Sequence, residues 1–163
     1  MASPFSQEVT TDARHADAKI IDVRPYRLKE HLERGEIVIV AGFQGVSLCK
    51  EVTTLGRGGS DTSAVALGVA LNAEKIEFYK DVDGIFDRDP KKYPLAHFFP
   101  SLTYRKALEY VQKDKGVLHP RSIKLAELNG MPLHVLPFHS PSKEGTFIQS
   151  DTSSKPLSCI YEL

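Results

Sequence analysis

Residues 53–62 read TTLGRGGSDT, and this stretch holds the densest set of chemical signals in the chain. Its three glycines permit a sharp backbone bend or the close approach of a ligand. A sequence rich in Ala, Val and Leu follows, so a helix is expected over 62–71, with Ser60 and Asp61 at its start. The N–H groups of a helix start favour an anion, and Arg57 adds a permanent cation with a planar fork of donors. The stretch therefore predicts an anion-binding turn.

The glycine pattern also leaves a purely structural alternative open. A G-x-G-G segment is typical of a plain turn, in which Asp61 merely favours the first turn of the helix. The stretch is not the dinucleotide fingerprint G-x-G-x-x-G, because Asp61 takes the place of the third glycine. It also lacks the Gly-Lys-Ser/Thr of a Walker loop. On its own, the pattern does not separate a ligand site from a turn.

The segments on either side of the glycine stretch predict a layered α/β fold. Residues 37–41 form a continuous apolar run, as expected of a strand buried on both faces of a parallel sheet. Residues 75–79 predict the next strand, since Ile76 and Phe78 alternate with Glu77. Ligands of such folds bind beyond the carboxyl ends of the strands, which gathers three loops on one rim: 42–45, 53–61 and 80–90.

The other elements are predicted from periodicity and end signals. Short strands are expected over 18–23, 133–136 and 146–148. Three further helices are predicted: 26–34 ending at Gly35, 104–113 capped by Thr103, and one that begins at Pro120 and ends at Gly130. His119 directly precedes Pro120, so a capping role is its first interpretation.

The composition of the chain excludes several classes of function. Its 163 residues fit one domain, and 21 basic residues balance 21 acidic ones, so nucleic-acid binding has little support. No apolar run approaches the ~20 residues of a membrane span, and the polar start lacks the apolar core of a signal peptide. Cys49 and Cys159 are far apart and predict unpaired thiols in a reducing, cytoplasmic setting.

A second cluster of charge follows the strand expected over 75–79. Residues 81–90 read DVDGIFDRDP, which places four carboxylates within nine residues. An EF-hand calcium loop requires Gly at its sixth position and Glu at its twelfth, and neither stands there. A solvated acidic turn remains the structural alternative, although the predicted ligand rim favours a binding role.

Four motifs together resemble the aspartate kinases of the amino acid kinase family. They are VAGFQGV at 40–46, TTLGRGGSDT at 53–62, YKDVDGIFDRDP at 79–90 and VLHPRS at 117–122. Their order and spacing also fit, and the resemblance runs from about Val9 to about Ile148. The glycine motif is the specific part, because other members of the superfamily carry different residues there.

The resemblance implies a three-layer α/β/α sandwich with a mainly parallel sheet. It also implies ATP-dependent phosphorylation of the β-carboxylate of L-aspartate, with Mg²⁺, as the first step toward lysine, threonine and methionine. ATP and L-aspartate would be the partners of a cytoplasmic transferase that forms homo-oligomers or self-associates, without nucleic acid or membrane.

The resemblance further implies the roles of individual residues. Arg57, Gly58, Gly59 and Ser60 would hold aspartate. Asp61 would organise the groups around the transferring phosphoryl, with Arg57 as the second catalytic residue, and no residue is assigned as a metal ligand. The nucleotide site would be lined by Tyr79, Lys80, Asp81, Ile85, Phe86, Asp87, Arg88, Asp89, Pro90, Lys115 and Gly116.

Two departures from the family pattern narrow the functional hypothesis. The Lys-Phe-Gly-Gly loop of the first strand has no counterpart, so residues 1–150 are interpreted as the C-terminal half of a catalytic domain. Residues 151–163 are expected to form a flexible tail without a regulatory domain. Gly116 stands where the family carries a lysine, and Lys115 is one residue earlier.

These departures predict a chain that is weak or inactive as a kinase by itself. The alternative is a non-catalytic fragment that binds a nucleotide or an amino acid, or a subunit that requires a partner. The helix expected over 62–71 is apolar nearly all round, which predicts self-association if part of it is uncovered.

Overall fold

The computed structural model describes residues 8–113, 117–140, 143–150 and 158–161. The described helices are α1 (Tyr26–Glu33), α2 (Gly59–Ala70), α3 (Tyr104–Lys113) and α4 (Pro120–Asn129). The longer strands are β1 (Val9–Thr11), β2 (Ile20–Val23), β3 (Gln44–Ser47), β4 (Val52–Thr54), β5 (Ile76–Lys80), β9 (Leu133–Pro137) and β10 (Thr146–Ile148). The shortest are β6 (Ile85–Phe86), β7 (Phe98–Phe99) and β8 (Ser101–Leu102).

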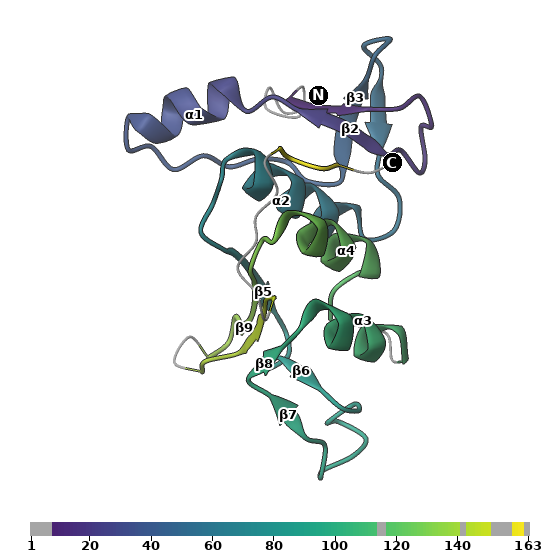
Figure 1. Ribbon diagram of the computed structural model, residues 1–163, viewed down its shortest axis with the longest axis vertical. Coiled ribbons are helices and arrows are strands. Elements are labelled where there is room, and N and C mark those ends of the chain that lie inside the picture. Colours follow the sequence, from purple (N-terminus) through teal and green to yellow (C-terminus); the bar gives the residue numbers. More distant parts are fainter. Residues whose placement is uncertain (1–7, 114–116, 141–142, 151–157, 162–163) are drawn as a thin grey trace.

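The strands form two four-stranded sheets at opposite ends of the molecule, with α2 and α4 between them (Figure 1). One sheet has the order β2-β1-β3-β4, and we call it the upper sheet. The other has the order β5-β9-β10-β8, and we call it the lower sheet. A hairpin of β6 and β7 extends from the lower end. The glycine stretch leads from β4 of the upper sheet into α2, so it joins the two parts of the fold.

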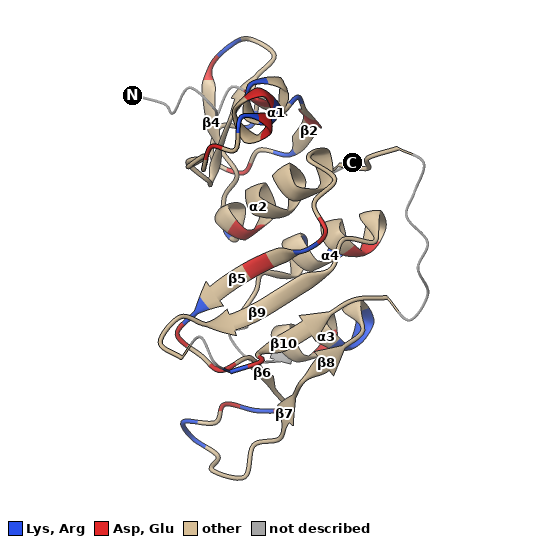
Figure 2. Cartoon of the chain, turned by 90° about the vertical axis from the view of Figure 1, so that its left-hand side faces the viewer, with Lys and Arg blue, Asp and Glu red and all other residues tan. Residues whose placement is uncertain are grey.

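Both sheets are mixed, which corrects the expectation of a mainly parallel sheet. Parallel pairing occurs between β1 and β3, between β5 and β9, and between β8 and β10. The other pairs are antiparallel. The α/β class itself is as expected, because β5 and β9 run parallel and the chain between them includes α3 and α4, which lie on one face of the lower sheet (Figure 2).

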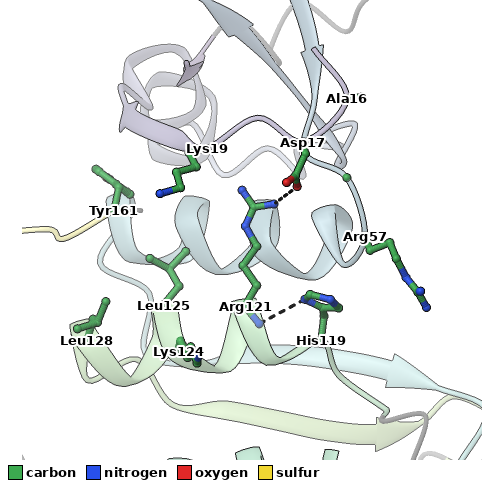
Figure 3. A pocket seen from close by; sticks show the side chains of 11 residues that line it. Ala16, Asp17, Lys19, Arg57, His119, Arg121, Lys124, Leu125, Leu128 and Tyr161 are labelled. Carbon is green, nitrogen blue, oxygen red and sulfur yellow. Dashed lines mark hydrogen bonds and ion pairs between the residues drawn. The ribbon is translucent and has the colours of Figure 1, made fainter. Parts of the chain in front are cut away.

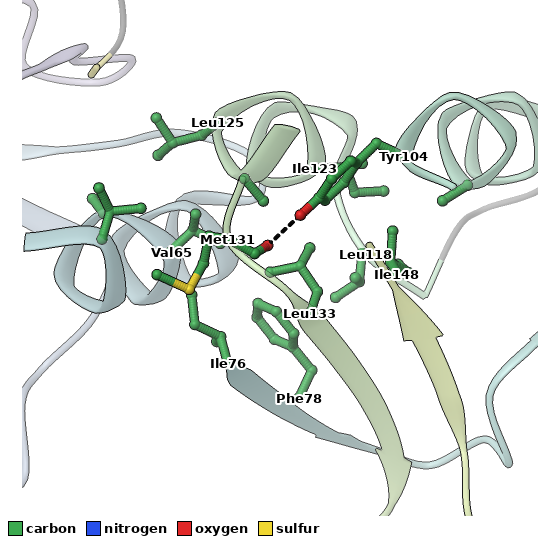
Figure 4. Close-up of a cluster of buried hydrophobic side chains, with 14 of the residues drawn as sticks. Val65, Ile76, Phe78, Tyr104, Leu118, Ile123, Leu125, Met131, Leu133 and Ile148 are labelled. Carbon is green, nitrogen blue, oxygen red and sulfur yellow. Dashed lines mark hydrogen bonds between the residues drawn. The ribbon is translucent and has the colours of Figure 1, made fainter. Parts of the chain in front are cut away.

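The main core lies where α2 and α4 meet the lower sheet (Figure 4). Leu133, Val135 and Ile123 are fully buried there. The Tyr104 hydroxyl donates to the carbonyl oxygen of Met131 at 2.7 Å, and burial raises the pKa of this phenol to about 12. The buried hydroxyl of Tyr104 therefore has a hydrogen-bond partner within the core.

The apolar helix α2 is covered by this core. Val65 and Ala66 have no exposed surface, and Gly68 leaves room for Ile76, whose side chain would meet an added Cβ at 2.7 Å. The helix begins at Gly59, a little earlier than expected, because Gly58 adopts a left-handed conformation and caps it. None of the large exposed apolar side chains among the described residues belongs to α2.

Residues 37–41 do not form the expected buried strand. Ile37 is 96% exposed and Ile39 is 86% exposed, while Val38 and Val40 are partly buried. This alternation is that of an extended backbone, but the segment belongs to no sheet. The physical reason is that none of the described strands lies beside it to pair with its N–H and C=O groups. We call residues 37–41 the open segment.

The other predicted elements are confirmed within a few residues at each end. The side chain of His119 accepts a hydrogen bond from the Arg121 N–H and caps α4, and Gly130 ends that helix with a φ of 59°. Thr103 accepts a bond from the Lys106 N–H at 3.3 Å, as expected of the cap of α3. Among the described helices, none has the length and apolar character that a membrane crossing demands.

The expected tail lies partly outside the described residues, which omit 151–157 and 162–163. Residues 158–161 lie against α4. The Asn129 side chain donates to the Ile160 carbonyl oxygen at 2.7 Å and accepts from the Ile160 N–H at 2.8 Å. Tyr161 packs against the core. This part of the tail is therefore anchored.

Candidate substrate-binding site

The glycine stretch forms a tight turn that only glycine fits. Gly58 has a φ of 72°, a conformation that L side chains rarely adopt. A Cβ added there would lie 2.1 Å from the ring of His119. The backbone N–H and the hydroxyl of Thr62 both donate to the Gly58 carbonyl oxygen at 2.9 Å, which fixes the first turn of α2. The turn is thus held between α2 and the start of α4.

An open pocket of about 480 Å³ lies at this turn. Phe43 forms one wall, and residues 56–61 form the rest. The Phe43 N–H donates to the Ser63 hydroxyl at 3.2 Å, so the wall is tied to α2. Arg57 is exposed, and its guanidinium has no ion pair with any of the described residues. The pocket therefore combines a helix N-terminus with an available cation, which suits an anionic ligand.

Asp61 connects three elements at the edge of this pocket. One carboxylate oxygen accepts from the Lys80 ammonium at 3.0 Å, and the other accepts from the His119 N–H at 3.1 Å. The Asp61 side chain is only 15% exposed and that of Lys80 is 29% exposed. Asp61 therefore fixes the start of α2, the carboxyl end of β5 and the start of α4. Two residues predicted for different roles are brought together here.

Two residues outside the predicted site also shape it. The guanidinium of Arg121 donates to the carbonyl oxygens of Leu55 and Ala18, the latter at 2.5 Å. It therefore braces the segment that enters the glycine turn. The ring of His119 packs against Gly58. The sequence signal for both residues was the motif at 117–122, which indicated the family but not these contacts.

The residues predicted to line the nucleotide site are spread along β5 and the loop that follows it. Tyr79 is 58% exposed, and its hydroxyl donates to Glu77 at 2.8 Å, which raises the pKa of the phenol. Asp81 follows β5 as an exposed residue. Ile85 belongs to the core at 3% exposure, and its N–H donates to the Thr146 hydroxyl at 2.9 Å. Ile85 is thus positioned by the lower sheet.

The end of the predicted nucleotide loop makes contacts mainly within itself and with the β7 side of its hairpin. Asp87 pairs with Arg88 at 2.9 Å and accepts from the His97 N–H at 2.7 Å. The Arg88 guanidinium is the main cause that lowers the pKa of Asp87. Asp89 accepts from the Lys91 N–H at 2.9 Å, and Phe86 packs on Phe98. Pro90 follows in the same loop, whereas Lys115 and Gly116 lie outside the described residues.

Comparison with models of known protein families shows which family this chain belongs to. The model of the amino acid kinase family matches residues 3–137. The chain belongs to the amino acid kinase family. This match includes both the glycine turn and the loop after β5.

Curated aspartate kinases are among the proteins that this chain resembles. The chain is similar to an aspartokinase of Mycolicibacterium smegmatis, with 45% identity over 150 residues, which cover 91% of this chain and 35% of the relative. It is also similar to an aspartokinase of Geobacillus stearothermophilus, with 43% identity over 145 residues, which cover 89% of this chain and 35% of the relative. The chain thus spans about a third of the length of the curated relatives it matches.

Solved structures show the same likeness. The aspartate kinase of Synechocystis has a TM-score of 0.76 at 37% identity, and the match covers 96% of this chain and 26% of that one. Aspartokinase III of E. coli, in complex with aspartate and ADP, has a TM-score of 0.75 at 28% identity, and the match covers 94% of this chain and 35% of that one. The expected amino acid kinase-like α/β fold is confirmed as a portion of that fold.

Proposed function

We propose that this chain is the portion of an aspartate kinase that binds L-aspartate and contacts the phosphates of ATP. The observation that carries the proposal is the glycine turn, where an available arginine, a helix start and the Asp61–Lys80 pair lie together. The aspartate and ADP named in the E. coli relative support the two ligands. Residues 1–150 then contribute part of the catalytic domain.

Aspartate binding is assigned to the open pocket at the glycine turn. Arg57 clamps one carboxylate of aspartate through two parallel hydrogen bonds. The backbone of Gly58 and Gly59 permits close approach, and Ser60 presents its hydroxyl and the start of α2 to the same ligand. The second carboxylate remains able to act as the nucleophile.

The phosphates of ATP are assigned to the carboxyl end of β5, where Lys80 lies. In the chemical step, an oxygen of the aspartate β-carboxylate attacks the γ-phosphorus of ATP. The bond from this phosphorus to the oxygen it shares with the β-phosphorus breaks, so the products are aspartyl phosphate and ADP. Lys80 neutralises charge on the transferring group, and Asp61 holds Lys80 in place.

Mg²⁺ enters the proposal only as a companion of the nucleotide. Among the described residues, no three His, Cys, Asp or Glu side chains gather into a group able to hold a metal. Both oxygens of Asp61 already accept hydrogen bonds. The proposal therefore assigns none of the described residues as a direct ligand of Mg²⁺.

Calorimetry tests the two binding sites separately. Replacing Arg57 with Gln is expected to weaken aspartate binding by at least about tenfold, because a charged hydrogen bond is lost. Arg57→Lys retains the charge but loses the planar fork, so an intermediate affinity is expected. Arg105→Gln, at an exposed arginine of α3, serves as the matched control. Absence of both ATP and aspartate binding in the unaltered chain would overturn the proposal.

A second pair of variants tests the phosphate side. Lys80→Gln is expected to weaken ATP binding while leaving the affinity for aspartate within about twofold. Lys75→Gln, at the lysine that pairs with Glu77 just before β5, is the control. Equal losses for the two ligands would show that Lys80 acts through the stability of the whole site.

The rival function is a binding fragment or subunit that requires a partner for catalysis. The observation that favours it is the open segment, which leads directly to Phe43 in the wall of the pocket and exposes Ile37 and Ile39. We therefore expect weak turnover for the chain alone in an assay of hydroxamate formation from ATP and aspartate. Turnover close to that of a full-length aspartate kinase would eliminate this rival.

The wider setting is part of the same proposal. Aspartyl phosphate formation places the chain at the first step toward lysine, threonine and methionine. A cytoplasmic location is supported by Cys49 and Cys159, which are both free and exposed. Self-association is supported by the exposed apolar side chains of the open segment.

A further inference from the structure

A second and larger cavity lies behind the glycine turn. It is an open pocket of about 760 Å³ between α4 and the turn that joins β1 to β2. Its lining includes Asp17, Lys19, Arg121, Lys124, Leu128 and Tyr161, and we call it the α4 pocket. A volume of this size is typical of sites for small molecules. None of these six residues belongs to the substrate pocket described above.

The α4 pocket carries an excess of positive charge. Among the described residues that line it, Lys19, Arg121 and Lys124 are cations and Asp17 is the one carboxylate, whereas Arg57 lies at its wall with the side chain directed away (Figure 3). Asp17 is 3.8 Å from the Arg121 guanidinium and its side chain is 79% exposed, so it neutralises little. Because the whole chain has no net charge, this local excess of cations is a distinct feature. The pocket therefore favours an anionic group.

The lining also includes two leucines and a tyrosine. Leu125 is 2% exposed and rises from α4 toward Lys19, which descends from the turn above it (Figure 3). Leu128 is 51% exposed, one turn further along α4. Burial raises the pKa of the Tyr161 phenol, so its hydroxyl stays protonated and can donate a hydrogen bond. Apolar surface and cations are thus presented to the same space.

We infer that the α4 pocket binds a small organic anion, a carboxylate or a phosphate monoester, that bears an apolar group. The anionic group lies near Lys19 and Lys124, and the apolar group packs on the exposed Leu128, beside the buried Leu125. A ligand with only one of these two properties contacts only half of the lining.

The same geometry connects this pocket to aspartate binding, a step that rests on the function proposed above. Gly56 and Arg57 line both pockets, so the turn forms the wall between them. In Figure 3 the Arg57 side chain points away from the α4 pocket. One guanidinium serves one anion at a time, so an occupant that draws Arg57 inward lowers the affinity for aspartate. Linkage makes the effect reciprocal.

Calorimetry with four probes tests the inferred site without reference to catalysis. Phenylbutyrate and phenyl phosphate are expected to bind, and their relative affinities distinguish a carboxylate site from a phosphate site. Phenylbutanol lacks the charge and inorganic phosphate lacks the apolar group, so both are expected to bind at least about tenfold more weakly, which equals about 1.4 kcal/mol. Equal binding of either control probe, or no binding of the two amphiphilic probes, would overturn the inference.

Variants locate the binding. Leu128→Asp and Lys124→Gln change exposed residues of the pocket, so the fold is expected to persist, and each should weaken the amphiphilic probes several-fold. Lys29→Gln, at an exposed lysine of α1, should leave them unchanged. If both pocket variants bind phenylbutyrate and phenyl phosphate with unchanged affinity, the probes bind elsewhere and the inference is wrong.

The coupling to aspartate has its own measurement. The affinity for aspartate is expected to fall several-fold at a saturating concentration of phenylbutyrate. If phenylbutyrate binds and aspartate affinity does not change, the site stands and the coupling is refuted. If phenylbutyrate binds and aspartate does not bind at all, the proposed function is refuted and the α4 pocket stands.

Discussion

β9 and the open segment have similar apolar sequences but opposite surroundings. β9 pairs with β5 on one side and β10 on the other, and its Leu133 and Val135 are fully buried. None of the described strands pairs with the open segment, and Ile37 and Ile39 are exposed. The difference teaches that an apolar run becomes a core strand only where neighbours satisfy its backbone and cover its side chains.

This contrast also distinguishes the two sides of the open pocket at the glycine turn. One side is held by buried elements, through Asp61 and its bonds to β5 and α4. The other side is Phe43, which follows the open segment and is 43% exposed. The pocket is therefore held by hydrogen bonds on the side of the lower sheet and is exposed on the side of residues 37–43.

The largest expected effect compares one apolar residue from each region. Leu133→Ala removes a fully buried side chain and is expected to lower the free energy of unfolding by about 2–5 kcal/mol. Ile39→Ala removes an exposed one and should change it by less than about 0.5 kcal/mol. Denaturant unfolding of both variants measures the difference. Similar losses for the two would mean that the open segment is packed in solution.

A pair of glycines sharpens the comparison at the level of the backbone. Gly58 and Gly35 have almost the same φ, 72° and 76°, but an added Cβ meets the His119 ring at 2.1 Å in the first and nothing within 4 Å in the second. Gly35→Ala is expected to cost about 1 kcal/mol from φ strain alone. Gly58→Ala should cost about 1–3 kcal/mol more, from the overlap, and should weaken aspartate binding. Thermal unfolding and calorimetry measure both effects.

Equal losses of stability for Gly35→Ala and Gly58→Ala would show that the contact between the turn and α4 does not restrict residue 58. In that case the His119 ring yields to the added methyl group, and the turn is not braced by it. The aspartate affinity of Gly58→Ala would then stay close to that of the unaltered chain.

A pH-dependent effect is expected within the closed core. Burial raises the pKa of Tyr104 to about 12 in the folded state, so folding favours the protonated phenol. Its contribution to stability is fully present below the unfolded pKa of about 10 and is lost as the pH rises toward 12. Tyr104→Phe lacks the hydrogen bond to Met131, which is worth about 1 kcal/mol. Because it has no ionisable phenol at this position, it should also lack the decrease in stability at alkaline pH.

Unfolding as a function of pH checks this prediction. Tyr26→Phe is the control, because that side chain is 76% exposed. The difference between Tyr104→Phe and the unaltered chain should shrink as the pH rises above 10. A constant difference would contradict the assigned cause.

The smallest effect on stability belongs to the open segment. Replacing Ile37 and Ile39 together with Thr should change the free energy of unfolding by less than about 0.5 kcal/mol, because both side chains are already in water. The same change should reduce self-association and the binding of a hydrophobic dye. Sedimentation over a range of concentrations provides the measurement. Unchanged association would move the interface to another surface.

Local signals in the sequence were enough to predict most elements. Pro120 and Gly130 bracket α4, and Thr103 caps α3, because these residues act on their own neighbours. The turn at residues 56–59 and the helix that follows it were also predictable, because the glycines and the apolar run after them are local signals. Such features depend on interactions between residues that are close in the sequence.

What the sequence did not reveal depends on contacts between distant residues. The fate of residues 37–41 depends on strands that must lie beside them. The contact of Lys80 with Asp61 joins residues 19 apart, and that of Arg121 with Ala18 joins residues 103 apart. The His119 ring against Gly58 is of the same kind. Composition and periodicity contain no information about such pairs.

The position of Arg121 has a consequence for how the molecule assembles. Its guanidinium joins carbonyl groups that precede it by 66 and 103 residues, so long loops must close before the glycine turn is braced. During synthesis, Ala18 and Leu55 leave the ribosome well before α4 does. The turn is consequently completed late, when α4 docks on α2, and contacts of such long range slow the folding of this region.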